Sequence, residues 1–146
     1  MNIRIDKYLP HQPPMLMVDT ITDISNTHVV TEFAVVRDCI FVEGGRFAEV
    51  GLIENMAQTC SAIVGQFLFG IEDSSNYVVG YISAIKQAEI FALPAVGSTV
   101  CTKAALRSRF DSEAYILCAM QCQVYEGERL LASAEMNLVI KPDVTQ

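Results

Sequence analysis

Length, composition and charge limit the classes of protein to which this chain can belong. Its 146 residues are 51% hydrophobic and 18% charged, with a formal net charge of -7. Lys and Arg are scattered rather than clustered, so we expect no nucleic-acid partner. We expect a single domain over residues 1–146, and the high apolar content favours further burial between subunits of an oligomer.

Cysteine usage and the N-terminal sequence both indicate the cytoplasm. The five cysteines are an odd number, form no C-x-x-C motif and lie mostly in apolar stretches, as reduced buried thiols do. Cys118 and Cys122 share a predicted strand face without suitably spaced His or acidic ligands, so we expect no metal site, and no cofactor is indicated. The start, MNIRIDKYLPHQPP, lacks the apolar core of a signal peptide.

The N-terminal third predicts a β-hairpin followed by a break. Residues 15–24 (MLMVDTITDI) and 28–36 (HVVTEFAVV) are rich in β-forming residues, and a turn-forming Ser-Asn-Thr joins them. Residues 37–47 (RDCIFVEGGRF) contain a Gly-Gly pair and interrupt the pattern.

A long apolar helix is predicted over residues 48–70, and the glycine at its end is a plausible stop signal. Its length would suit a membrane span, but the costly burial of its polar residues in lipid excludes that interpretation, so we expect no membrane association. These residues are Glu49, Glu54, Asn55, Gln58 and Gln66. After a polar loop over 71–76, four strands are predicted at 77–91, 99–110, 113–125 and 129–141, the last three as a meander.

A helix that is apolar on nearly every side must be enclosed. A strongly curved antiparallel sheet wrapped around it is the simplest enclosure for so few elements, which predicts an α+β hot-dog fold. Because an exposed edge strand invites pairing, we expect two such units to join edge to edge.

Glu54 is the residue of this helix that most suggests chemistry. Glu54, Gln58 and Ser61 lie at i, i+4 and i+7 and form a polar stripe on an apolar rod. Such an acid can interact with the helix dipole and cap nearby amides, with Gln58 satisfying it. Alternatively, it is a desolvated acid at the mouth of an acyl tunnel, where backbone amides near Val50 and Gly51 polarise a carbonyl oxygen.

Three segments carry a resemblance to a known family. YLPHQPPMLMVDTI (8–21), LIENMAQTCSA (52–62) and VVGYISAIKQAEIFALPAVGSTV (78–100) resemble, in order and spacing, motifs of the FabZ and FabA group of 3-hydroxyacyl-(acyl-carrier-protein) dehydratases. The resemblance implies a hot-dog fold and removal of water from an acyl thioester carried by acyl carrier protein or coenzyme A. It also implies that Glu54 is the catalytic acid and that Gln58 positions it.

The loop before the helix departs from that family. Its dehydratases have a histidine base in this loop, whereas FVEGGRFAEVG (41–51) contains none. The segment is more similar to ApeP-like dehydratase subunits of aryl polyene synthesis, which lack this histidine and work beside a FabZ-like subunit. The resemblance implies a heteromeric site combining a partner histidine with Glu54, and it leaves His11, of the L-P-H opening, as the alternative base.

These observations predict a dehydratase-like subunit of fatty-acid-type or aryl polyene synthesis. The candidate catalytic residues are Glu54 and His11, and Gln58, Gly51, Val50 and Phe41 are candidates for substrate binding. Two alternatives remain open. One is a hot-dog thioesterase in which Glu54 activates water, and the other is a non-catalytic acyl-binding or scaffold subunit in which Glu54 only satisfies helix amides.

Overall fold

The computed structural model describes residues 3, 5, 8–9, 11–66 and 77–143, which form one long helix and two antiparallel sheets. The helix, α1, spans Glu49–Gln66. The strands of the large sheet are β1 (Thr20–Ile24), β2 (His28–Ala34), β5 (Tyr77–Ile90), β6 (Thr99–Asp111), β7 (Ile116–Glu126) and β8 (Arg129–Asp143). A small hairpin consists of β3 (Val42–Glu43) and β4 (Arg46–Phe47).

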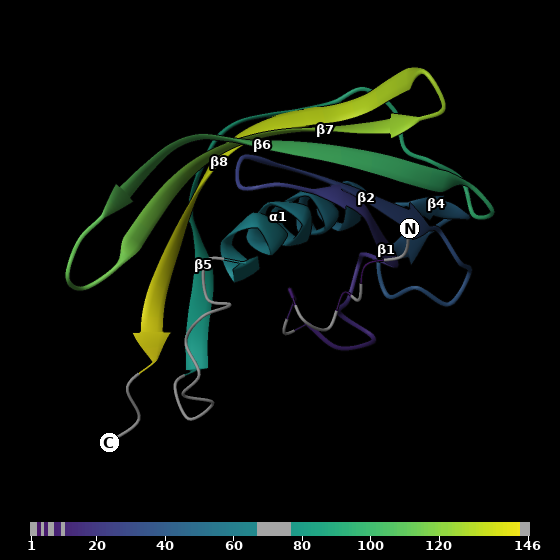
Figure 1. Cartoon of the computed structure of the whole chain (residues 1–146). Helices are drawn as coiled ribbons and strands as arrows, with labels where there is room; N and C mark the ends of the chain where they lie inside the picture. Colours follow the sequence, from purple (N-terminus) through teal and green to yellow (C-terminus); the bar gives the residue numbers. More distant parts are fainter. Residues whose placement is uncertain (1–2, 4, 6–7, 10, 67–76, 144–146) are drawn as a thin grey trace.

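The large sheet curves around the helix. Its strand order is β1-β2-β6-β7-β8-β5, and every neighbouring pair is antiparallel. Figure 1 shows α1 lying in the concave side of this sheet, with β5 and β8 bending down past one end of the helix. This arrangement confirms the predicted α+β hot-dog fold.

Period-two alternation in the strands builds the core. Along β7, Cys118, Met120, Cys122 and Val124 are all buried, and the residues between them are partly exposed. The helix contributes its own buried side chains, among them Leu52, Met56, Cys60 and Ile63. Each large apolar side chain buried in this way contributes about 1.5–3 kcal/mol relative to an exposed one. The helix is therefore held mainly by apolar packing against the concave face.

The first predicted strand begins too early. Residues 15–19 are not part of β1, because Met15 and Leu16 donate their backbone N–H groups to Gln12 O at 2.9 and 3.1 Å and close a turn. Asp19 follows, and its carboxylate accepts the backbone N–H of Ala34 at 2.7 Å. The apolar composition predicts a strand from residue 15, but the backbone groups of residues 15–17 bond within a turn and to helix side chains instead.

The turn before β7 also shortens a predicted strand. Residues 113–115 are not in β7, because the hydroxyl of Ser112 accepts the backbone N–H groups of Ala114 and Tyr115 at 3.3 and 3.1 Å. Serine side chains commonly stabilise turns in this way. The other strand boundaries agree with the predictions to within about two residues.

The predicted break at 37–47 contains the unpredicted β3–β4 hairpin. Gly44 and Gly45 have φ values of 60° and 78°, as the two central residues of a type I′ turn require. The helix follows at once, and the backbone N–H of Leu52 donates to Ala48 O at 3.1 Å. Its predicted end at residue 70 and the loop 71–76 lie outside the described residues.

Strand β5 forms one edge of the large sheet. Every described side chain from residue 82 to residue 89 is exposed, on both faces of the strand. Ile85 lies opposite the buried Met136 of β8 but is itself 43% exposed. The concave apolar face therefore continues onto β5 without a covering element in the described part of the chain. Among the described residues, no helix is long and apolar enough to cross a membrane.

Candidate functional site

A cavity of about 250 Å³ lies between one face of α1 and the edge of the large sheet. The helix contributes residues at i, i+3, i+4 and i+7, which lie on a single stripe. The residues that line the cavity are His11, Glu54, Ala57, Gln58, Ser61, Ile82 and Leu138. The polar stripe predicted from the sequence therefore faces a cavity, and His11 reaches the same cavity from the N-terminal segment.

Glu54 is partly buried and is oriented by Gln58. The side-chain Nε2 of Gln58 donates to Glu54 Oε1 at 2.9 Å. Among the described residues, Gln58 is the donor that the Glu54 carboxylate has, and no backbone N–H of the helix donates to it. Glu54 thus acts as a lining acid of the cavity rather than as an N-terminal cap of the described helix.

Gln58 also holds the segment that leads to His11. Its Oε1 accepts the backbone N–H of Met17 at 2.7 Å, and its Nε2 donates to the carbonyl of Met15 at 2.9 Å. The side chain is only 1% exposed, so these bonds satisfy polar groups that water cannot reach. One side chain therefore joins the acid to the N-terminal segment.

His11 is half-buried beside Glu54. Burial lowers the pKa of His11 below its usual 6.5. The negative charge of the neighbouring Glu54 carboxylate raises the pKa, but by less than burial lowers it. Its Nδ1 is buried and has no hydrogen-bond partner among the described residues. At neutral pH the imidazole is mainly uncharged, which is the form that can accept a proton.

A family model for the ApeP dehydratase, described as ApeP-like, matches residues 3–146. The chain belongs to the ApeP-like dehydratase family. A search of curated proteins by sequence found no significant match.

Solved structures agree with this assignment at the level of the fold. The chain of the dehydratase heterocomplex ApeI:P from Xenorhabdus doucetiae superimposes with a TM-score of 0.82 at 20% identity, covering 98% of this chain and 93% of that chain. A hypothetical thioesterase protein with coenzyme A from Streptococcus pneumoniae has a TM-score of 0.63 at 14% identity, covering 86% and 87%. The PaaI protein from the phenylacetic acid degradation operon of E. coli has a TM-score of 0.62 at 10% identity, covering 81% and 79%.

Three predicted substrate-binding residues of this ApeP-like chain lie at the start of α1, outside the lining of the cavity. Val50 is 60% exposed, whereas Gly51 is buried. A Cβ atom added at Gly51 would stand 2.5 Å from the ring of Phe47 and 2.9 Å from Cβ of Phe41. Phe41 also accepts the backbone N–H of Ala48 through its carbonyl at 2.8 Å. Gly51 thus packs against Phe41 and Phe47, one turn before Glu54.

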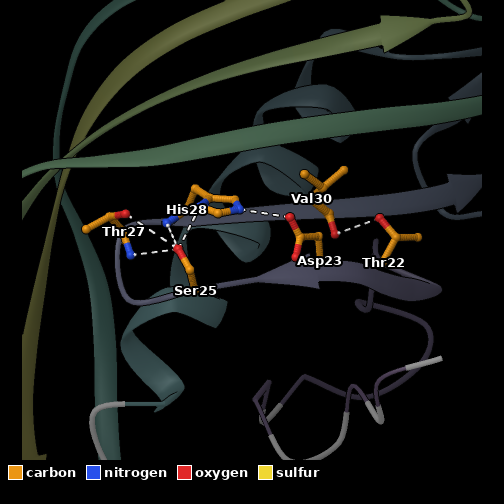
Figure 2. A network of polar contacts seen from close by, with 6 residues as sticks. All are labelled: Thr22, Asp23, Ser25, Thr27, His28 and Val30. Atoms are coloured by element: carbon orange, nitrogen blue, oxygen red, sulfur yellow. Dashed lines mark hydrogen bonds and ion pairs between the residues drawn. The ribbon is translucent and has the colours of Figure 1, made fainter. Parts of the chain in front are cut away.

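His28 belongs to a separate polar network in the β1–β2 hairpin (Figure 2). Its Nδ1 lies 2.6 Å from Ser25 Oγ, and its Nε2 lies 2.8 Å from Asp23 Oδ2. The Ser25 hydroxyl also accepts the backbone N–H groups of Thr27 and His28, as in a serine-stabilised turn. Although these residue types occur in hydrolase triads, here the serine is engaged by its own turn, and the histidine is exposed.

Sequence reasoning did not single out Asn55, Thr102, Ile82 or Leu138 as parts of the site region. Asn55 and Thr102 are both fully buried, and the other two line the cavity. A signal for Asn55 was present, because an amide inside an apolar helix must find a partner. The sequence holds no comparable signal for Ile82 and Leu138. They lie on neighbouring strands, and they come near the helix only because the sheet curves around it.

Proposed function

We propose that this ApeP-like chain is a subunit of a dehydratase that acts on 3-hydroxyacyl thioesters carried by acyl carrier protein or coenzyme A. Glu54 is the catalytic acid, and Gln58 positions it. The observation that carries this proposal is the Glu54 carboxylate in the cavity, held at one oxygen by Gln58 and facing the same space as His11.

In this reaction a base removes the proton on the carbon next to the thioester carbonyl. The electron pair forms the carbon–carbon double bond as the bond to the 3-hydroxyl breaks. Glu54, in its protonated form, transfers its proton to the departing hydroxyl, which leaves as water. The products are water and a trans-2-enoyl thioester, and no oxidant or reductant is consumed.

The base is proposed to come from a second hot-dog subunit of FabZ-like type. The loop 41–51 of this chain contains no histidine and forms the β3–β4 hairpin and the helix start instead. The structurally similar ApeI:P from Xenorhabdus doucetiae is a dehydratase heterocomplex. Within this chain, His11 is the alternative base, because it is near Glu54 and burial keeps it uncharged at neutral pH.

The start of α1 is proposed to receive the thioester carbonyl. The first N–H groups of a helix have no partner within it, and they carry the positive end of the helix dipole. Val50 and Gly51 supply such groups one turn before Glu54, and Phe41 packs beside Gly51. A carbonyl oxygen bound there would be stabilised as negative charge develops on it.

Reconstitution tests the proposal. The purified chain, a FabZ-like partner, and a mixture of the two are each given a 3-hydroxyacyl carrier-protein substrate, and enoyl product is followed. We expect the mixture to exceed the sum of the separate rates. Replacing His11→Asn in this chain then locates the base, because a partner histidine leaves the gain intact and a His11 base abolishes it. No gain on mixing would argue against the shared site.

Thioester hydrolysis is the second candidate function. It is favoured by the structural similarity to a hypothetical thioesterase with coenzyme A and by a lining carboxylate without a loop histidine. In this case Glu54 would activate water for attack on the thioester carbonyl, releasing a free acid and a thiol. Thiol release from an acyl-CoA, without enoyl product, would select hydrolysis over dehydration.

A further inference from the structure

Two amide side chains of α1 bind the backbone of residues 15–17 much as a neighbouring strand would. Asn55 Nδ2 donates to Met17 O at 2.7 Å, while Gln58 accepts Met17 N–H at 2.7 Å and donates to Met15 O at 2.9 Å. Asn55 and Gln58, hereafter the amide pair, are one helical turn apart and are buried. The segment is therefore fixed to the helix by side chains, not by a sheet.

Thr102 of β6 determines which way the Asn55 amide points. Its hydroxyl donates to Asn55 Oδ1 at 2.6 Å, which leaves Nδ2 directed at Met17 O. Thr102 and Asn55 are both 0% exposed, so water cannot replace either bond. Turning the Asn55 amide over would leave buried hydrogen-bond partners unsatisfied, which is costly enough to hold a single orientation. The sheet, the helix and the N-terminal segment are linked through this one amide.

The held segment leads directly to His11. The N–H groups of Met15 and Leu16 both bond to Gln12 O, so a closed turn separates His11 from the residues bound by the amide pair. On the helix side, Asn55 is the residue directly after Glu54. One short turn thus connects the Asn55–Met17 bond to the imidazole that shares the cavity with Glu54.

We propose that Asn55, oriented by Thr102, is a positioning residue that holds the Met17 carbonyl and thereby sets His11 against Glu54 in the cavity. This inference rests on the proposed function for its catalytic meaning. Its structural content stands separately, because the placement of His11 is measurable without turnover.

The two histidines of the chain allow a direct test by NMR of the imidazole signals. Thr102→Val removes the hydroxyl that orients Asn55 and keeps the side-chain volume. We expect the His11 signals to shift and its titration midpoint to rise toward 6.5, because burial is the larger influence that lowers the pKa. Glu54 is the ionisable group facing His11 in the cavity lining, where Ile82 and Leu138 are apolar. His28 makes its own side-chain hydrogen bonds to Ser25 and Asp23 in the hairpin of Figure 2, so its signals are expected to stay unchanged.

Thr31→Val is the matched control. Thr31 is a fully buried β2 threonine that lies opposite Thr102 in the sheet, and its hydroxyl bonds to Thr59 of the same helix at 2.8 Å rather than to the amide pair. Its loss is expected to lower stability as well, but to leave the His11 signals in place. Thr102→Ser restores the donor and is expected to return the His11 signals to their wild-type positions.

The outcomes separate positioning from general stabilisation. A His11 shift in Thr102→Val that is absent in Thr31→Val supports the proposal, and equal shifts in both variants, or none in either, overturn it. If Thr102→Val does not fold, Asn55→Leu removes the bond to the Met17 carbonyl without adding a charge. Its His11 signals are then compared with those of Thr31→Val in the same way. Glu54→Gln tests the proposed function independently, because lost or retained turnover in that variant does not affect the NMR result for Thr102.

Discussion

The two oxygens of the Glu54 carboxylate have different surroundings. One accepts a hydrogen bond from Gln58, and the residue as a whole lines the cavity with His11. A carboxylate that only satisfied the helix would be expected to bond to amides of the first turn. Its position near the middle of a polar stripe that faces a cavity favours a role in chemistry.

Glu54→Gln tests this role. The variant keeps the shape and retains an oxygen that can accept from Gln58, but it cannot transfer a proton. We expect the rate of enoyl formation by the reconstituted complex to fall about 100-fold to 10,000-fold, the usual contribution of general acid catalysis. Thermal unfolding should change little.

Glu49→Gln is the control for that experiment, since Glu49 is an exposed acid in the first turn of the same helix. It is expected to leave the rate unchanged. A Glu54→Gln variant with full activity would instead select the non-catalytic subunit, in which the carboxylate has only a structural role.

At the scale of elements, the start of α1 combines close packing with the amides proposed to bind a carbonyl. Gly51 lies against the ring of Phe47, which is itself completely buried, and against Phe41. The missing side chain lets the helix approach the β3–β4 hairpin. This contact therefore determines where the helix N-terminus stands.

Gly51→Ala gives a test with a definite sign. In an open helix position this change would stabilise by up to about 1 kcal/mol, because alanine is the better helix former. Here the added methyl would overlap the Phe47 ring, so we expect the free energy of unfolding in urea to fall by about 1–3 kcal/mol. Val50→Ala, at the exposed neighbouring position, should stay within about 0.5 kcal/mol of wild type. A stabilised Gly51→Ala would contradict the close packing.

The strands and the helix show which structural features the sequence pattern can predict. The alternation from Cys118 to Val124 predicted a strand face correctly, because period two and burial agree there. The run from Met15 failed, because apolar composition does not reveal whether a backbone bonds to a strand or to helix amides. Likewise, the stripe of Glu54 and Gln58 followed from helical spacing. The approach of His11 did not, because it depends on how residues 15–17 are held across 41 positions of sequence.

For the whole molecule, the uncovered edge at β5 is the feature that points to assembly. Ile82 and Ile85 are 39% and 43% exposed, and Ile82 also lines the cavity. A long edge strand with unpaired backbone groups and apolar side chains is a template for pairing with another chain. An assembly at this edge would also bring a partner subunit close to Glu54.

Ile85→Lys tests the edge. A charge placed there should oppose burial of the strand against a second subunit, so we expect light scattering after gel filtration to show a smaller assembly. Val36→Lys is the control, because Val36 is similarly exposed, at 49%, and lies outside β5. An unchanged mass for Ile85→Lys, or an equal loss in both variants, would place the contact elsewhere.

The bonds of Gln58 restrict what a substrate can find in the cavity. An amide nitrogen has two hydrogens, and those of Gln58 are taken by Met15 O and Glu54 Oε1. Its oxygen already accepts from Met17 and has a single lone pair left. Gln58 therefore has no hydrogen to give to a carbonyl. A bound thioester must obtain its hydrogen-bond donor elsewhere: from the imidazole N–H of His11, from the helix start or from a second subunit.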